Sequence, residues 1–533
     1  MENLFREFLK EYESKVINLS KETALSYFNA SISGKAEDYQ RSSELQLRLS
    51  KVFTNKEDFA KLKSFKESNT INDSLLIRQL ELIYNSYASN QFEEKLLEEI
   101  ITLSSKIEET FATYRADVNG NKLSDNQIDE ILDNSTDQTE LEDAWKASKQ
   151  IGSVVEKDVI ELVKLRNKAA CQMGYNNYHE MSLDLSEQST AELDSLFDEL
   201  DDLTRDAFTI LKSEIDSFLS EKHKLSADQL MPWHYQDKFF QHGPKIYTVT
   251  LDSYFENKNI EHITKEYFNG MGLNIDDLIE RSNLYEKEGK YQHAYCTDID
   301  KRGDIRVVCN IKPNHRWMST MLHEFGHAAY DKFINTELPW SLREPAHIFT
   351  TEAIAMLFGR FASNPVWLRD VIVIEENEAE KISSACFNSL RLEQLAFSRW
   401  VQVMYRFEKA MYENPNQDLN ELWWTLVEKY QQLKKPAGRN SADWASKIHV
   451  ALYPAYYHNY MLGELLASQL NNYILKNVLH EKDSMSFKAN KKVGNYLKSL
   501  FFCPGSSMSW KDLIATSTEE PLSAKHYANQ FVE

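Results

Sequence analysis

The sequence has little glycine or proline. There are 15 Gly and 11 Pro among 533 residues, and proteins built from many strands and tight turns need more of both. At the same time, 42% of the residues are hydrophobic and 27% are charged, as in a folded protein that buries a large core. We therefore expect a mainly helical fold.

Long apolar runs and clusters of basic residues are also missing. No segment approaches the ~20 apolar residues of a membrane-spanning helix, and the N-terminus MENLFREFLKEYESKV is charged from its second residue, unlike a signal peptide. The net charge is −21, whereas nucleic-acid binding needs clustered lysines and arginines that displace counterions. We expect neither a membrane nor a nucleic-acid partner.

Cysteines are few and show no CxxC spacing. Their number is odd, which is more typical of reduced thiols in a cytosol than of a disulfide framework. The five are Cys171, Cys296, Cys309, Cys386 and Cys503. We therefore expect a cytoplasmic protein.

Along the chain, helical patterns are broken by short polar turns. Apolar residues at steps of three and four from Leu96 to Tyr114 predict one amphipathic helix, and the polar stretch 117–137 indicates a loop region. Alternation in 289–310 around the turn 300–304 predicts a β-hairpin, the only strong strand signal in the chain. A predicted helix over 317–333 follows directly.

That helix contains the segment HEFGH. Because His323 and His327 are four residues apart, their imidazoles project from one helix face and can share a zinc ion. Glu324 can then take the proton of a zinc-bound water that attacks a carbonyl, while zinc lowers the pKa of the water and polarises the carbonyl. Chance gives on the order of 0.03 such strings in this composition, so the segment indicates a zinc peptidase.

A catalytic zinc needs a third protein ligand and an open fourth position. Glu352 begins an apolar helical pattern, EAIAML, downstream of the two histidines. Taken alone, Glu352 could be a first-turn glutamate favoured by the helix dipole. With His323 and His327 upstream, we assign it as the third ligand.

The C-terminal part offers hydrogen-bond donors for a tetrahedral oxyanion, which needs donors besides zinc. They are Lys447, His449, Tyr456, Tyr457 and Tyr460. Taken alone, the tyrosines and the histidine are more typical of a helical core, and the lysine of a solvated surface. Only the zinc motif upstream favours a functional role.

Together these segments resemble the angiotensin-converting-enzyme family of peptidyl-dipeptidases, in a bacterial-type single-domain form. The segments FLKEYESKVINLSKETALSYFNASISGKAEDYQ, HEFGHAAYDKF, LPWSLREPAHIFTTEAIAML, the tryptophan pair 423–424 and ASKIHV occur in the family's order. The resemblance implies a mainly α, two-lobed zinc peptidase with a deep central cleft and a small β-hairpin beside the HExxH helix. One catalytic domain would occupy residues 1–533, with 1–89 as an N-terminal helical lid.

The resemblance also implies a role for each matching residue. Glu324 would act as general base and acid, His449 would support the tetrahedral intermediate, and Tyr460 would donate to the oxyanion. The ligands of one Zn²⁺ per chain would be His323, His327 and Glu352.

Five residues would hold the peptide substrate: His293, Ala294, Lys447, Tyr457 and Gln241. Lys447 would bind the C-terminal carboxylate. The spacing matches the family pattern only to within one residue, so Tyr456 is the alternative to Tyr457. Two positions depart from the family. Met356 stands where an aspartate usually orients a zinc-bound histidine, and Asn459 replaces a chloride-binding arginine.

We therefore predict a zinc-dependent peptidase that releases dipeptides from the free C-terminus of oligopeptides. A thimet-type zinc oligoendopeptidase is the alternative among enzymes, and Lys447 favours the first reading. A catalytically silent binding module on the same scaffold is the alternative from another class, and the complete set of ligands disfavours it. Nothing in the sequence points to a particular oligomeric state.

Overall fold

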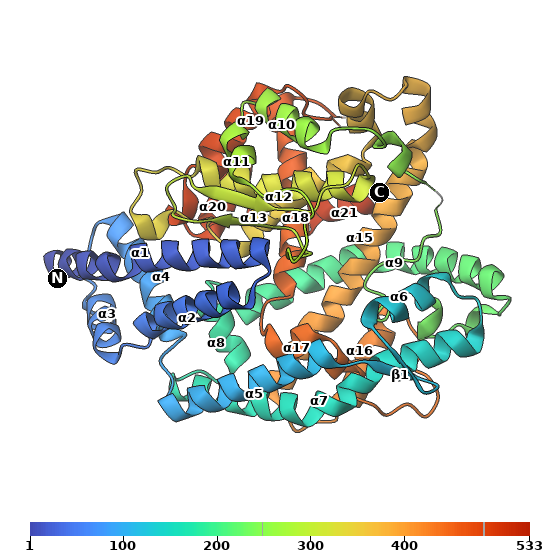
Figure 1. Cartoon of the computed structure of the whole chain (residues 1–533), viewed down its shortest axis with the longest axis horizontal. Helices are drawn as coiled ribbons and strands as arrows, with labels where there is room; N and C mark the ends of the chain where they lie inside the picture. Colours follow the sequence, from blue (N-terminus) through green and yellow to red (C-terminus); the bar gives the residue numbers. More distant parts are fainter. Residues whose placement is uncertain (248, 483–484, 533) are drawn as a thin grey trace. The chain divides into compact units, whose positions relative to one another are not determined.

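The computed structural model describes residues 1–247, 249–482 and 485–532. Nearly all of its regular elements are helices (Figure 1), which confirms the expected mainly α fold. The chain divides into two compact units, each assembled from separate stretches of sequence. The first unit takes residues 1–91, 249–387 and 462–527, and the second takes 92–248, 388–461 and 528–533.

The first unit begins with four helices: α1 (Glu2–Ser33), α2 (Ala36–Phe53), α3 (Lys56–Ser68) and α4 (Ser74–Ala88). Phe5, Phe8 and Phe65 are buried where these helices pack together. The side chains of Asn55 and Asp73 cap α3 and α4 by accepting hydrogen bonds from backbone N–H groups. The segment 1–89 is thus helical, and its role as a lid stays a prediction.

The rest of the first unit surrounds a small sheet. Strands β3 (Tyr295–Asp298) and β4 (Ile305–Val308) pair in antiparallel fashion, which confirms the predicted hairpin. Both strands pack against α12 (His315–Phe333), which begins two residues before the predicted start because Asn314 accepts a hydrogen bond from the backbone N–H of Trp317. The other helices include α10 (Ile260–Gly270), α11 (Asp276–Arg281), α13 (Ile348–Gly359), α14 (Pro365–Trp367), α19 (Lys491–Tyr496) and α20 (Trp510–Thr518).

The second unit is built on long helices. They include α5 (Glu94–Thr113), α7 (Gln138–Gln172), α8 (Tyr178–Leu185), α9 (Thr190–His223), α16 (Leu419–Leu426) and α17 (Ile448–Leu452). Helix α5 confirms the helix predicted between Leu96 and Tyr114. Three further helices, α15 (Glu376–Glu413), α18 (His458–Tyr473) and α21 (Lys525–Phe531), contain residues of both units.

The polar stretch 117–137 is not a plain loop, so that prediction is wrong. It contains most of a second hairpin, β1 (Ala116–Val118) with β2 (Asn121–Leu123), and helix α6 (Asp125–Asn134). Asn119 and Gly120 have φ angles of 53° and 85°, as a two-residue hairpin turn requires. Ser124 and Gln127 then form a capping box that starts α6. The sequences of the hairpin and of α6 are short and polar, which is why they resemble a loop.

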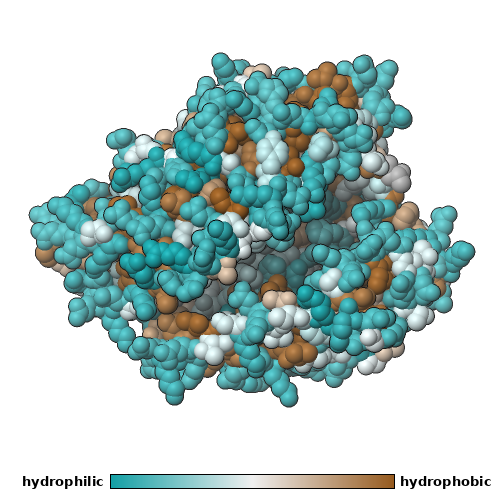
Figure 2. All heavy atoms as spheres, viewed as in Figure 1, coloured by the Kyte–Doolittle hydropathy of each residue, from teal (hydrophilic) through white to brown (hydrophobic). Residues whose placement is uncertain are grey.

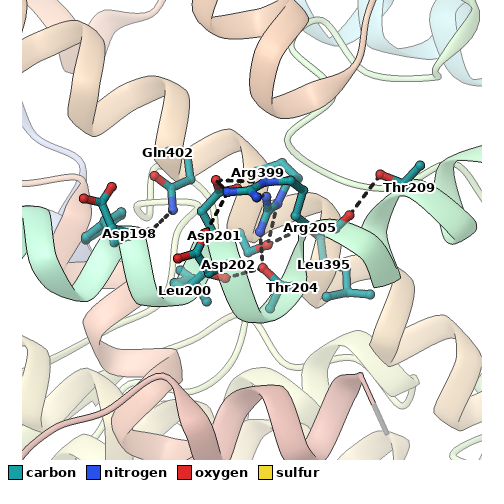
Figure 3. Close-up of polar contacts among 12 residues, drawn as sticks. Asp198, Leu200, Asp201, Asp202, Thr204, Arg205, Thr209, Leu395, Arg399 and Gln402 are labelled. Atoms are coloured by element: carbon teal, nitrogen blue, oxygen red, sulfur yellow. Dashed lines mark hydrogen bonds and ion pairs between the residues drawn. The ribbon is translucent and has the colours of Figure 1, made fainter.

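A buried ion pair joins α9 and α15 in the second unit (Figure 3). Arg399 is 1% exposed; its guanidinium donates to Asp201 at 2.5 Å and to the hydroxyl of Thr204. Arg205 binds the same carboxylate from the next turn of α9. Because removing one partner would leave an uncompensated buried charge, this contact fixes the position of α15 on α9.

One face of the molecule is seen to be mostly polar in the space-filling view of Figure 2, in keeping with the net charge of −21. No helix within the described ranges is long and apolar enough to cross a lipid bilayer. The five cysteines, all of them in the described ranges, form no disulfide bond.

Candidate metal centre

Three predicted ligands meet in the first unit, on the adjacent helices α12 and α13 (Figure 1). The Nε2 atoms of His323 and His327 lie 3.8 and 3.9 Å from Oε2 of Glu352. Ligand atoms of a tetrahedral zinc, with bonds of about 2.0–2.1 Å, are roughly 3.3 Å apart. In the part of the chain that the structure describes, this is the one cluster of such groups close enough to share a metal ion.

Two glycines allow helices to pack closely at this cluster. A Cβ atom on Gly326 would lie 3.0 Å from Cα of Ala355, so α12 and α13 touch backbone to backbone there. A Cβ atom on Gly463 of α18 would lie 3.0 Å from Sδ of Met356 and 3.1 Å from Cβ of Glu352. Gly326 therefore sets the distance between the two helices that carry the ligands, and Gly463 lets α18 pack closely against α13.

The protonation states of the site suit a divalent cation. Burial lowers the pKa of His323 to about 4 and that of His327 well below its ordinary value, so both imidazoles are neutral and have a free lone pair. Burial raises the pKa of Glu352 to about 7, and that of Glu324 to about 8 with Glu352 adding to the effect. A bound divalent cation would offset this cost of burial and favour the charged forms of both carboxyl groups. Two neutral imidazoles and a carboxylate are the His₂Glu donor set of catalytic zinc sites, so the residues fit Zn²⁺.

Exposure differs among the groups of the site. Glu324 is 8% exposed, and the side chains of His327 and Glu352 are 13% and 15% exposed, whereas that of His323 is 31% exposed. Solvent therefore reaches the cluster mainly beside His323. The imidazole of His327 is also contacted on the side away from Glu352, where its Nδ1 lies 2.7 Å from the hydroxyl oxygen of Thr351. Nothing in the sequence pattern pointed to Thr351.

The predicted pair His293 and Ala294 also belongs to the first unit. These residues fall in the predicted hairpin segment 289–310 but lie just before β3, so the first strand begins later than that segment suggested. His293 is exposed, and its ring lies 5.4 Å from that of Tyr291. The segment is anchored by the buried ammonium of Lys290, which donates to the carbonyl oxygens of Asn283 and Tyr285 at 2.8 and 2.9 Å and also to that of Cys309. Lys290 thus ties the segment before β3 to the backbone of three other residues.

The second unit brings together the residues predicted to bind the substrate carboxylate. Nζ of Lys447 donates to Oε1 of Gln241 at 2.7 Å and lies 5.6 Å from the centre of the Tyr457 ring. The hydroxyl of Tyr457 accepts a hydrogen bond of 2.9 Å from Trp400. Burial lowers the pKa of Lys447 to about 8, although Asp237 attracts the charge. A desolvated ammonium of this kind gains much from an anionic ligand.

The predicted oxyanion donors lie next to this lysine. The ring of His449 is 5.0 Å from that of Tyr457, which in turn lies 5.4 Å from Tyr460. Tyr456 packs instead on Tyr460, at 5.5 Å. Burial, together with the charge of Lys447, lowers the pKa of His449 to about 4, so its imidazole is neutral near pH 7. Its Nδ1 is buried without a hydrogen-bond partner among the described residues.

A strained turn connects the two helices that present these groups. Ala455, between α17 and α18, has a left-handed backbone with φ 52°, which costs a non-glycine residue about 1–2 kcal/mol. The buried carboxylate of Glu408 accepts a hydrogen bond of 2.7 Å from the N–H of Ala455, and Arg166 donates to the carbonyl of Ala451 at 2.8 Å. Sequence reasoning missed both, since they come from the distant helices α15 and α7.

Comparison with known proteins gives consistent matches. A family model described as angiotensin-converting enzyme matches residues 1–531. The chain is 24% identical to an angiotensin-converting enzyme of Rattus norvegicus over 269 residues, which cover 47% of this chain and 20% of that protein. It is 23% identical to the angiotensin-converting enzyme-like protein Ace3 of Mus musculus over 451 residues, covering 76% of this chain and 59% of that protein.

A third relative is described as inactive. It is the inactive angiotensin-converting enzyme-related protein of Caenorhabditis elegans, 22% identical over 276 residues that cover 49% of this chain and 28% of that protein. The matches therefore span between 20% and 59% of the length of these three proteins.

Proposed function

Because the chain belongs to the angiotensin-converting enzyme family of peptidases, we propose that it is a zinc-dependent peptidase that releases dipeptides from the free C-terminus of oligopeptides. One observation carries the zinc-peptidase proposal. The Nε2 atoms of His323 and His327 converge on the carboxylate of Glu352, and the buried carboxyl group of Glu324 sits between the histidines on the same helix.

In the proposed reaction, Zn²⁺ would be held by His323, His327 and Glu352, and when bound it lowers the pKa of water and polarises the substrate carbonyl. Glu324 takes the proton of the attacking water and returns it to the leaving amine. Its burial supports this role, because a desolvated carboxylate holds a proton more strongly than one in water. Substrate would approach the cluster beside His323, the most exposed of the three ligands.

Substrate recognition would be the task of the second unit. The ammonium of Lys447, already bonded to Gln241 and beside Tyr457, would bind the terminal carboxylate of the peptide. His449 and Tyr460 would donate hydrogen bonds to the oxyanion, for which a neutral imidazole suffices. In the first unit, the exposed His293 and the half-buried Ala294 would contact the substrate backbone.

Two other functions make different predictions. A thimet-type oligoendopeptidase would use the same metal ligands without needing a terminal carboxylate, so the buried Lys447 weighs against it. A silent binding module remains the alternative from another class, because one relative is named inactive. The present chain retains the three ligands and Glu324, which favours activity.

The test combines metal analysis with product identification. The purified chain is assayed for bound zinc, then incubated with a free-acid oligopeptide and with its C-terminal amide, and the products are identified by mass spectrometry. We expect one zinc per chain and dipeptides from the free acid alone. Equal cleavage of both peptides would favour the oligoendopeptidase, and zinc with no cleavage of any peptide would favour the silent module.

A further inference from the structure

The hydroxyl of Thr351 contacts one ligand residue and is next in sequence to another. Its oxygen lies 2.7 Å from Nδ1 of His327, and the following residue is the ligand Glu352. Thr351 is 8% exposed, so water does not readily take its place. One turn of α13 therefore supplies both the ligand Glu352 and, through Thr351, a contact to the ligand His327 on α12.

This contact fixes which nitrogen of His327 faces the metal position. An imidazole that binds a metal through Nε2 carries its remaining hydrogen on Nδ1, and a partner at Nδ1 holds both the ring orientation and that tautomer. In the structure Nε2 is the atom that faces Oε2 of Glu352, at 3.9 Å. The Thr351 oxygen, on the other side of the ring, can accept from the Nδ1–H group.

We propose that Thr351 is the positioning residue of the metal ligand His327, a role for which this chain uses a neutral hydroxyl instead of a carboxylate. The inference rests on the proposed zinc function. Met356, four residues after Glu352, has no group that can orient an imidazole, and its sulfur packs towards Gly463. A hydroxyl adds no negative charge to the site, so it orients the ring without attracting the metal ion.

The chain offers a matched control in the preceding residue. Thr350 is also buried, at 0% exposure, and its hydroxyl donates to the carbonyl of His347 at 2.7 Å instead of contacting a ligand. Thr350→Val and Thr351→Val therefore each remove one buried hydroxyl from the same helical turn. Only the second change removes a contact to a metal ligand.

The experiment measures zinc affinity by competition with a chelator of known affinity, using the full chain. We expect Thr351→Val to raise the zinc Kd about 10–100-fold, the range found when partners of metal ligands are removed. Thr351→Ser, which keeps the hydroxyl, should stay within about threefold of the wild type, as should Thr350→Val. Thr351→Ala, which cannot clash, replaces Thr351→Val if the latter does not fold.

Thermal unfolding of the metal-free proteins separates positioning from stability. Thr350→Val, which removes two hydrogen bonds with the backbone of His347, should lose at least as much stability without metal as Thr351→Val, while only Thr351→Val binds zinc more weakly. Equal zinc affinity in these two variants, or equally weak binding by Thr351→Ser and Thr351→Val, would overturn the proposal. If the wild type binds zinc and cleaves peptides, the proposed function stands whatever the Thr351 variants show.

Discussion

The two units present their functional residues in different ways. In the first, two regular helices carry the ligands and Glu324, and the contact at Gly326 fixes the distance between those helices. In the second, the groups come from a loop at Gln241, the short helix α17 and a turn with a left-handed alanine. Local helical spacing brings His323, Glu324 and His327 together, and one contact between helices adds Glu352, whereas the second group depends throughout on contacts between distant segments.

The largest expected effect tests the helical group. Glu324→Gln should keep zinc and lower kcat by about 10²–10⁴-fold, because an amide cannot take the proton of water. His327→Ala should instead lose the metal. Zinc content and initial rates on a free-acid peptide check both. If Glu324→Gln kept a tenth of the wild-type kcat, Glu324 would not be the base.

The next effect tests the loop-borne group. Lys447→Ala should cost about 2–4 kcal/mol on a free-acid peptide, mainly through KM, because the terminal carboxylate loses a charge-assisted contact. Activity on the C-terminal amide should change little. Lys429→Ala, which removes an exposed lysine of the same unit, is the control. Unchanged preference for the acid in Lys447→Ala would contradict the assignment and favour the oligoendopeptidase.

The third prediction concerns pH. Burial lowers the pKa of Lys447 to about 8, and only the protonated amine attracts a carboxylate. The preference for acid over amide, measured as the ratio of their kcat/KM values, should therefore be full below pH 8. Above it, the ratio should fall by up to about tenfold per pH unit. The ratio should be flat with pH in Lys447→Ala; a parallel fall there would assign the titration to another group.

A smaller effect is expected at the strained turn. Ala455 has φ 52°, so Ala455→Val should destabilise the protein by about 1–2 kcal/mol, because a β-branched residue fits this conformation poorly. Ala455→Gly should be close to neutral. Urea denaturation measures both. Equal stability of the two variants would show that the turn relaxes without cost.

The smallest effect should be that of chloride. Asn459 is buried and its side-chain oxygen accepts a hydrogen bond from Gln188 at 2.9 Å, so no charge is available there to bind an anion. Rates in chloride and acetate buffers of equal ionic strength should agree closely. A severalfold difference would mean that another buried basic group, such as Lys149, holds the anion.

The metal group could be predicted from sequence because helical geometry is local. The spacing of His323 and His327 already puts them on one face, and the alternation in 289–310 already describes a hairpin. The hairpin around Asn119 was missed although its Asn-Gly turn was visible, since its strands have three residues each.

Contacts between distant segments have no comparable signal in the sequence. Thr351 meets a ligand 24 positions away, and Glu408 meets the backbone of Ala455 across 47. Neither contact is marked by a periodic pattern or a motif. A single hydrogen bond between two packed segments depends on the packing of the whole core. The same holds for Lys447 and Gln241, which only a resemblance to a known family could pair.

The glycine contact between α12 and α13 has an evolutionary consequence. The HExxH pattern leaves its third and fourth positions unspecified, but in this chain packing restricts which residues both positions accept. Phe325 is fully buried, and any side chain at Gly326 would push against the backbone of Ala355, one turn from Glu352. Packing therefore constrains Phe325 and Gly326, just as the chemistry constrains His323, Glu324 and His327. A descendant could lose the reaction through a single added methyl group while every ligand was kept.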